Sequence, residues 1–542
     1  MAPAAVSEPA ASRRRLKPGP GIRIYRVLRQ AGNWRRTSVL SIALFTIGFR
    51  LALSHSLQHP EPSGHDEFSY LLGADLFAHG HLAAAPHPLW KFFESVNVIS
   101  RPVYAPKYPP AQSAFLAFGQ VVFHDPFYGV LFSVALFAAA VCWMLQAYVR
   151  TPWALLGGIC TALYFGAGHY WTESYWGGAV AGLGAALFVG AFGRLRKEQS
   201  LGSTAALGIG ALLLVTSRPF ESAALIVSLC IALIPVVWKG WRVSTLRAAL
   251  PLMISLAIAP MAILAYNYGV TGNALKLPYM VHFEQYGTAP LFWFQSPPAP
   301  KHFENAALQD TSERYEVAAY KEVISNSVPA RVQQNLLTIL GVTIFDGGGL
   351  GLVALFFVPL FQRDPTVRLF TLCASLLLAL LAVETYLFLH YMAPLVVVGI
   401  LLSCLMLDRL WKFHGKPCRD RILLVGVLSA LMVAGPVWRG VRAIGGHNGQ
   451  LHTSGGFGFR RAGVVRSILA RPGNHVVFVH FTPEQSPSVT WVANGADIDG
   501  SRLIWAHDRG AENRELQRYF AGRTFWLLED RTDGIRLSPY MK

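Results

Sequence analysis

The chain has 542 residues, of which 53% are hydrophobic and 14% are charged, and its formal net charge is +17. A soluble globular protein usually carries about 25% charged residues, so this composition excludes an ordinary soluble enzyme and favours a polytopic membrane protein. The first 36 residues hold nine Lys/Arg and one acidic residue. This arrangement predicts a basic cytoplasmic arm rather than a nucleic-acid-binding surface, and an Ala/Pro/Ser/Arg-rich arm should stay disordered until it meets anionic lipid.

Apolar blocks of roughly 17–25 residues follow the arm, and each is a candidate transmembrane helix. We expect eleven spans, at residues 37–54, 128–148, 153–168, 177–192, 201–216, 222–237, 246–266, 335–361, 367–388, 394–410 and 422–437. With the N-terminus inside, the short basic loops all fall on the cytoplasmic side. The long segments 55–127 and 268–334, three short corners and everything after Trp438 then lie outside. Residues 37–437 form the predicted transmembrane domain.

Two segments depart from this pattern of long spans. Residues 109–122 are apolar but short, so we expect an interfacial or re-entrant helix packed against the bundle. Residues 438–542 are polar and contain three β-like runs, HVVFVHF, SRLIWAH and TFWLLED, and a helical run, ENRELQRYFAG, that ends in glycine. These runs predict a small extracytoplasmic α/β domain.

The stretch GHDEFSY places Asp66 and Glu67 in the first outer loop, within about 12 residues of the end of the first span, near the height of a lipid-borne phosphate. A carboxylate at that height can act as general base on an acceptor hydroxyl or amine. His65 and Lys107 lie in the same loop, and a cation there can neutralise a leaving phosphate. The alternative is an ordinary exposed pair of loop acids.

Other ionisable residues lie at the outer ends of predicted spans. Glu173 stands among aromatic residues that are typical of a membrane interface, and it could bind sugar hydroxyls or the acceptor. Arg218 could contact a phosphate, or it could simply pair with Glu221 three residues later. His390 and Tyr391 could meet a donor phosphate.

Arg50, near the outer end of the first span, is expected to snorkel toward the lipid headgroups. The loop 268–334 could close over the site as a lid, or its charged run could lie on the membrane as an amphipathic helix. His282 and Glu284 in this loop lack a convincing third ligand, so we expect catalysis without a metal or another cofactor.

Several motifs together resemble the GT-C glycosyltransferases. They are the acidic pair after the first span, the K-x-P-P turn at 107–110, WTESYWGG at 171–178, YNYGVTGNALKLPY at 266–279 and HYMAP at 390–394. The resemblance is to the branch with protein O-mannosyltransferases, lipid A aminoarabinose transferases and related bacterial cell-envelope sugar transferases. It covers about residues 37–437. It implies a membrane enzyme that passes a sugar from a polyprenyl-phosphate carrier to a glycan, lipid or protein acceptor on the extracytoplasmic face, usually with inversion.

The resemblance also implies roles for individual residues. The first-loop acid of the family falls on Asp66 or Glu67, of which Asp66 is the expected base and Glu67 the supporting residue. Lys107 matches the phosphate-binding lysine, although Tyr108 is inserted before the prolines. From their positions in the outer loops and at the outer ends of spans, Arg218, His390 and Tyr391 are the further expected phosphate contacts, and His65, Glu173 and Glu221 are the expected sugar or acceptor contacts.

Two other classes of function compete with this reading. A secondary transporter often has inverted repeats and ions in mid-membrane, whereas here the ionisable residues gather at the predicted outer face. A non-catalytic membrane scaffold that presents the C-terminal domain is the other alternative, and loss of sugar transfer in Asp66→Asn would separate the enzyme from both.

Overall fold

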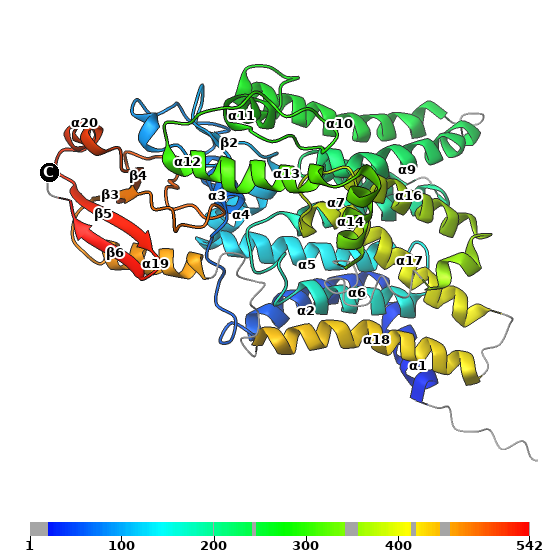
Figure 1. Ribbon diagram of the computed structural model, residues 1–542. Coiled ribbons are helices and arrows are strands. Elements are labelled where there is room, and N and C mark those ends of the chain that lie inside the picture. The colour runs from blue at the N-terminus through cyan, green and yellow to red at the C-terminus, as the bar shows by residue number, and fades with distance from the viewer. Residues whose placement is uncertain are drawn as a thin grey trace, which may run out of the picture.

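The computed structural model describes residues 20–198, 200–240, 245–341, 356–413, 419–444 and 456–540, which form a bundle of helices with an α/β domain at one end (Figure 1). The helices of the bundle and its loops are α1 Pro20–Asn33, α2 Arg35–Ala52, α3 His65–Ala78, α4 Ala111–Phe123, α5 Pro126–Leu145, α6 Thr151–Phe165, α7 Gly178–Leu195, α8 Leu201–Val215, α9 Pro219–Gly240, α10 Thr245–Thr271, α11 Pro278–Tyr286, α12 Ala306–Thr311, α13 Ala318–Ser325, α14 Val328–Gly341, α16 Pro365–Leu381, α17 Ala393–Lys412 and α18 Arg419–Ile444. A short ribbon, β1 Val98–Ile99 with β2 Ala105–Pro106, lies in the first loop.

The chain is an integral membrane protein. Within the described residues, five helices are long and apolar enough to cross a membrane, namely α5, α7, α10, α17 and α18, and five further apolar helices have 10–17 residues. A helix overlaps every predicted span except the middle of 335–361, of which residues 342–355 lie outside the described part. The positions of these apolar helices follow from composition, but the count of eleven spans is not confirmed.

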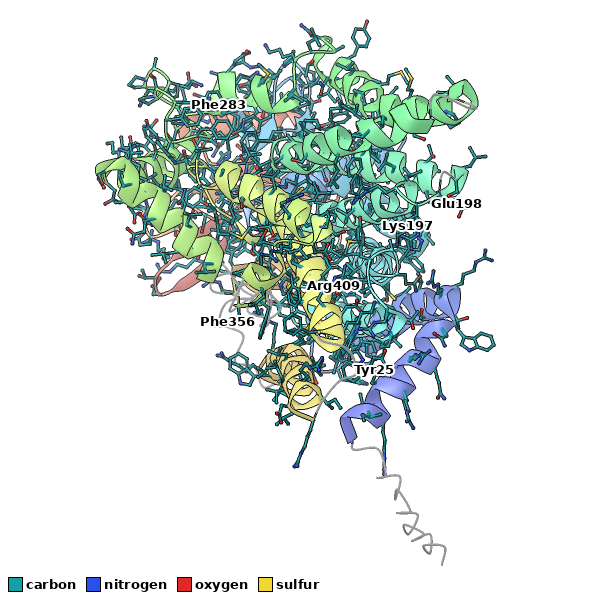
Figure 2. All side chains as sticks on the ribbon, turned by 90° about the vertical axis from the view of Figure 1, so that its right-hand side faces the viewer. Tyr25, Lys197, Glu198, Phe283, Phe356 and Arg409 are labelled. Carbon is teal, nitrogen blue, oxygen red and sulfur yellow. The ribbon has the colours of Figure 1, made fainter. Side chains whose placement is uncertain are left out.

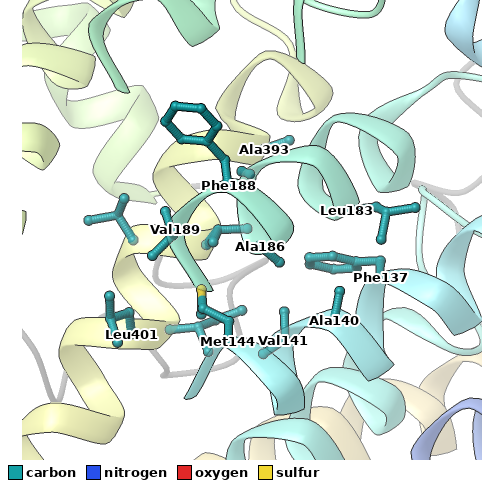
Figure 3. Packing of buried hydrophobic residues seen from close by; sticks show 14 of the residues in the cluster. Phe137, Ala140, Val141, Met144, Leu183, Ala186, Phe188, Val189, Ala393 and Leu401 are labelled. Atoms are coloured by element: carbon teal, nitrogen blue, oxygen red, sulfur yellow. The ribbon is translucent and has the colours of Figure 1, made fainter. Parts of the chain in front are cut away.

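Helices α5, α7 and α17 enclose the main apolar core (Figure 3). Phe137 and Met144 of α5, Phe188 of α7 and Leu401 of α17 are fully buried. Small residues on α7 let the backbones approach, and a Cβ atom on Gly190 would lie only 2.5 Å from the ring of Trp143. Such close packing is what holds helices together in lipid, where apolar surface alone gives no net attraction.

The short helix α4 packs directly on α5, as expected for the segment 109–122. A Cβ atom on Gly129 of α5 would lie 1.9 Å from the carbonyl oxygen of Phe115 on α4, and one on Gly119 would lie 2.4 Å from the Gly129 nitrogen. The two backbones therefore touch, and only glycine fits at this crossing.

The N-terminal arm differs from its prediction. Residues 20–33 form helix α1, which packs on the bundle, instead of a disordered segment. Its Tyr25 stacks on Trp411 with ring centroids 4.3 Å apart. The contact between these two half-buried rings anchors this part of the arm to α17, which its composition does not reveal. Residues 1–19 lie outside the described part.

The C-terminal domain contains helices α19 Phe457–Leu469 and α20 Asn513–Tyr519 and strands β3 His475–His480, β4 Leu503–His507, β5 Thr524–Arg531 and β6 Gly534–Pro539. The strand order is β4-β3-β5-β6, with β3 parallel to both neighbours and β6 antiparallel to β5. The three predicted strands and the helix α20 are present, while β6 and α19 were not predicted. Helix α18 runs to Ile444, beyond the expected boundary at residue 437.

The sheet shares its core with the first outer loop. Val476 and Phe478 of β3 pack in one cluster with Leu72 and Leu76 of α3 and with Phe92. A second cluster on the other face includes Phe457 of α19 and Val477. The domain is therefore fused to the membrane bundle through α3, which also carries the acidic pair.

Charged residues at the opposite end of the bundle pair with one another. Arg150, after α5, approaches Asp408 of α17 to 2.6 Å, and Arg409 approaches Asp364, before α16, to 2.8 Å. Figure 2 views the bundle from the side away from the C-terminal domain and labels Arg409 together with Lys197, just after α7. These pairs show that the ends of α5, α16 and α17 lie together, as the alternation of basic loops predicted.

Candidate active site

A cavity of about 1250 Å³ lies between the bundle and the C-terminal domain. Every segment that the sequence placed on the outer side contributes to its lining: the first loop (Asp66, Lys107), the corner before α7 (Tyr170, Trp176), the α8–α9 corner (Arg218, Glu221), the long loop (Tyr279, His282), the segment before α17 (Tyr391), and the chain from Trp438 onward (Arg439, Ser488). Segments far apart in sequence thus meet at one end of the bundle.

Asp66 and Glu67 open helix α3, but their environments differ. Glu67 accepts hydrogen bonds from the backbone N–H groups of Ser63, Gly64 and Tyr175 at 2.9, 3.0 and 3.0 Å. Its side chain caps the helix and is only 3% exposed. Burial raises the pKa of Glu67, and the three N–H donors oppose that rise. With these bonds made, Glu67 does not line the cavity, whereas Asp66 does.

The Asp66 carboxylate is held by two side chains of the first loop. Its Oδ1 accepts a hydrogen bond from the Tyr108 hydroxyl at 2.7 Å and another from the Asn97 amide. The side-chain oxygen Oδ1 of Asn97 in turn accepts a hydrogen bond from Lys107 Nζ. The inserted Tyr108 therefore contacts Asp66, and Asn97 links Asp66 to Lys107. Burial lowers the pKa of Lys107, and Asp66 and Glu316 oppose this shift.

Arg218 continues this network on the other side of Asp66. Its guanidinium lies 4.4 Å from the centroid of the Tyr391 ring, 3.6 Å from Glu221 Oε1 and 3.4 Å from the Tyr70 hydroxyl. Tyr70 stacks on Tyr108 at 4.6 Å. The structure thus brings five predicted residues together on one cavity wall: Asp66, Lys107, Arg218, Glu221 and Tyr391.

His65 also lines the cavity and connects it to the C-terminal domain. Its Nε2 lies 2.8 Å from the Pro487 carbonyl oxygen, and its Nδ1 contacts the Thr490 hydroxyl. A carbonyl only accepts, so Nε2 donates and Nδ1 accepts in the neutral ring. Burial lowers the pKa of His65, which favours this neutral form. Ser488 of the same loop reaches the cavity.

Besides Glu67, two other predicted site residues, Glu173 and His390, lie outside the cavity lining. The Glu173 carboxylate accepts hydrogen bonds from the Arg50 guanidinium at 2.9 Å and from Gly168 N–H at 3.0 Å. His390 is 1% exposed, with Nδ1 2.8 Å from the Tyr170 hydroxyl. Both residues support the corner before α7, from which Tyr170 lines the cavity.

The prediction that Arg50 snorkels is wrong. Arg50 is fully buried, and besides Glu173 it donates to the carbonyl oxygens of Leu57 and Gln58 at 3.1 and 3.0 Å. An acid far away in sequence compensates its charge, so the side chain has no need to reach the headgroups.

Sequence reasoning assigned no site role to several cavity residues that the structure brings in, among them Asn97, Glu384, Arg439 and Arg442. The two arginines follow Trp438 near the end of α18. A signal for them existed, because two arginines at the predicted outer end of a span oppose the usual charge bias. Asn97 has a φ angle of 65°, and nothing in its sequence context marks it as a site residue.

The cavity walls contain buried polar atoms that have no hydrogen-bond partner within the described residues. They include Trp176 Nε1, Asn267 Oδ1 and His282 Nε2. Buried polar groups are normally paired, so this set indicates a polar ligand. No group of three or more His, Cys, Asp or Glu in the described part of the chain comes together as a metal site. Glu284 pairs with Lys276 at 2.6 Å.

No family model matches the sequence, and no curated protein matches it. Among solved structures, ArnT from Cupriavidus metallidurans matches with 10% identity, 93% coverage of this chain, 94% coverage of that chain and a TM-score of 0.49. ArnT bound to undecaprenyl phosphate matches with 11% identity, the same coverages and a TM-score of 0.47. The Archaeoglobus fulgidus oligosaccharyltransferase tethered with an acceptor peptide has 11% identity, coverages of 92% and 69%, and a TM-score of 0.47.

These matches include a member of the class that the sequence motifs resemble, the aminoarabinose transferases.

Proposed function

We propose that this chain is a membrane glycosyltransferase that moves a sugar from a polyprenyl-phosphate carrier to an acceptor on the extracytoplasmic face. One observation carries the proposal: Asp66 and two cations, Lys107 and Arg218, line one cavity and are linked through hydrogen bonds and stacked rings. A base beside phosphate-binding cations is the arrangement that glycosyl transfer from a phosphate requires.

These groups account for the proton, the bonds and the charge that change in the reaction. The acceptor hydroxyl or amine loses its proton to Asp66 as its heteroatom bonds to the anomeric carbon of the sugar. The bond from that carbon to the phosphate oxygen breaks, and its electron pair stays on the phosphate. Lys107 and Arg218 neutralise the charge that develops there. Attack opposite the leaving group inverts the anomeric centre.

A lipid tail explains the apolar part of the cavity. Ile263 and Tyr266 of α10 line it, and the same helix exposes Ile258 and Met261 along its length. An apolar helix that joins a polar cavity to a lipid-facing surface offers a path for a polyprenyl chain, with the phosphate at the cavity and the tail in the bilayer.

The proposed orientation places the N-terminal arm in the cytoplasm and the cavity outside. It is supported by nine Lys/Arg in the first 36 residues and by the basic loops at the end away from the cavity. A reporter fused after Ile444 should show an extracytoplasmic location, and a cytoplasmic signal would overturn the orientation.

The proposed roles of the other predicted residues follow their positions. Glu67 fixes the start of α3 and thereby aims Asp66. Tyr391 and His390 help to hold Arg218 and the corner before α7 at the phosphate end. Glu221 orients Arg218, while His65 and Glu173 support the acceptor side through the C-terminal domain and Arg50.

Acceptor recognition is the role we assign to the C-terminal domain, because its Ser488 lines the cavity. Deleting residues 455–542 would also remove the partners of His65, so lost activity would not isolate this role. Exchanging only Ser488 for Trp is sharper. The KM for the acceptor should rise while donor binding is kept, and an unchanged acceptor KM would contradict the assignment.

The main test is sugar transfer by the purified full-length protein from polyprenyl-phosphate donors. Asp66→Asn should lower kcat by about 10²–10⁴-fold, the usual effect of losing a general base, while donor binding persists. Asp533→Asn, which alters an exposed acid paired with Arg536, is the matched control and should be neutral. Full activity in Asp66→Asn, or transfer by no donor, would refute the proposed mechanism.

A further inference from the structure

Glu384 is a buried cavity carboxyl group that the proposed reaction has not used. It lies between α16 and α17, is 1% exposed and lines the cavity. Neither of its carboxyl oxygens has a hydrogen-bond partner within the described residues. Glu67, by contrast, receives three backbone N–H bonds. Glu384 is therefore a buried acid whose two carboxyl oxygens can still form hydrogen bonds with a ligand.

The backbone holds Glu384 in place, so its position does not depend on a loose loop. Thr385 N–H donates to the Leu291 carbonyl at 2.8 Å, and Trp293 N–H donates to the Val383 carbonyl at 3.2 Å. The Asn335 amide donates to the Glu384 carbonyl at 3.1 Å. The chain thus fixes a carboxyl group at the wall without giving the side chain a partner.

The surrounding charges disfavour an ionised Glu384. Burial raises its pKa well above the usual range, Glu221 raises it further, and Arg218 opposes the shift. Arg218 already lies 3.6 Å from Glu221, so one guanidinium serves two acids. The hydroxyls of Tyr391 and Tyr279 also interact with Glu384, and they supply no positive charge. An unpaired buried carboxylate is costly, and a protonated carboxyl avoids that cost.

From this geometry we infer that Glu384 is a donor-binding residue, which holds a proton at neutral pH and donates a hydrogen bond to a phosphate oxygen of the polyprenyl-linked donor. The inference rests on the proposed function. A neutral carboxyl still has one O–H donor, and a phosphate beside Arg218 is the strongest acceptor that this wall could meet. An ionised Glu384 would instead repel the phosphate.

The inference predicts how binding depends on pH. The binding form of Glu384 is protonated, so affinity for the phosphate should fall as pH rises through the raised pKa of this carboxyl. Glutamine is neutral at every pH and keeps an N–H donor, whereas leucine keeps the bulk and loses the donor. Lys107, Glu221 and the phosphate also titrate and are present in all three proteins, so the change assigned to Glu384 is the difference between the pH profiles of the unaltered protein and the two variants.

Binding of undecaprenyl phosphate to the full-length protein in nanodiscs tests this. Glu384→Leu should weaken binding about 10-fold or more, because hydrogen bonds to charged groups are the strong class. Glu384→Gln should bind more tightly than Glu384→Leu, and its affinity should fall less at alkaline pH than that of the unaltered protein, because only the loss caused by Glu384 disappears. Glu322→Leu, at an exposed position on α13, controls for the apolar substitution. None of the three exchanges should change the affinity for unphosphorylated undecaprenol.

Several results would overturn the inference. One is equal weakening by Gln and Leu, which would mean that a carboxylate is needed. Another is unchanged binding in Glu384→Leu, or equal effects on undecaprenol and its phosphate. Infrared difference spectra of the unaltered protein against Glu384→Gln give an independent readout, and they should show a protonated carboxyl at neutral pH. If the unaltered protein binds no polyprenyl phosphate at all, the proposed function fails as well.

Discussion

Both ends of the helical bundle carry charged and polar residues, but these residues are paired with one another at one end and partly unpaired at the other. At the end away from the cavity, Arg150, Asp364, Asp408 and Arg409 pair among themselves at 2.6–3.0 Å. At the cavity end, polar atoms of four lining residues have no partner in the described part of the chain, namely Trp176, Asn267, His282 and Glu384. Complete pairing of the four charged residues at the end away from the cavity fits a structural role, whereas unpaired polar atoms in the cavity wall leave room for a ligand or for bound water.

If pairing decides the role of a residue, a paired residue near the cavity should be structural. Arg50 and Glu173 form such a pair at the cavity end and test this expectation. Arg50→Leu should lower the free energy of unfolding by about 3–5 kcal/mol, since it leaves a buried carboxylate without its partner. Thermal unfolding of the detergent-solubilised protein measures this. The double variant with Glu173→Leu should recover part of the loss. If Arg50→Leu were as stable as the unaltered protein, Glu173 would be available to a ligand.

A matched pair of arginines compares the two ends directly. Arg218→Gln should weaken polyprenyl-phosphate binding about 10–100-fold, because a charge-assisted hydrogen bond to phosphate is lost. Arg409→Gln removes a cation of the other end, so it should change stability and leave binding within about 2-fold. Equal losses of affinity in the two variants would remove the distinction between the ends.

A smaller effect is expected for the hydroxyl that holds the base. Tyr108→Phe keeps the ring stacked on Tyr70 and deletes the hydrogen bond to Asp66. A hydrogen bond to a charged group contributes about 1.5–3 kcal/mol. Because Asn97 still donates to Asp66 in this variant, we expect the lower end of that range, so kcat should fall about 10-fold with little change in the donor KM. Steady-state kinetics distinguish this result from a loss of donor binding, which would place Tyr108 at the phosphate instead.

The smallest effect concerns pH and the docking of the C-terminal domain. Burial lowers the folded-state pKa of His65 below its ordinary value of 6.5. The stability from its neutral contacts with Pro487 and Thr490 is therefore complete above pH 6.5 and is lost as pH falls through the lowered pKa. Hydrogen exchange of residues 485–492 in the full chain should accelerate in mild acid. His65→Gln should abolish this acid step, and an unchanged profile would exclude His65 as its cause.

Much of the fold could be predicted from apolar block lengths and the alternation of basic loops. The chain of contacts around Asp66 could not, because Asn97 and Tyr108 act through positions that the loop ribbon β1–β2 sets. The roles of Arg50 and Glu173 were equally hidden, since the two residues are 123 positions apart in sequence. Pairing over such distances is a property of the packed chain, not of either local pattern.

By itself, the sequence determined that the chain spans membranes, where its helices run, which loops share an end and that Asp66 stands in one of them. These properties follow from hydropathy and charge, which act locally along the chain. Only the tertiary structure decided which acid faces the cavity and which acids are hydrogen-bonded to other groups of the protein. A carboxylate is freed or fixed by the donors that surround it, and here those donors come from the two residues before α3, the corner before α7 and α2.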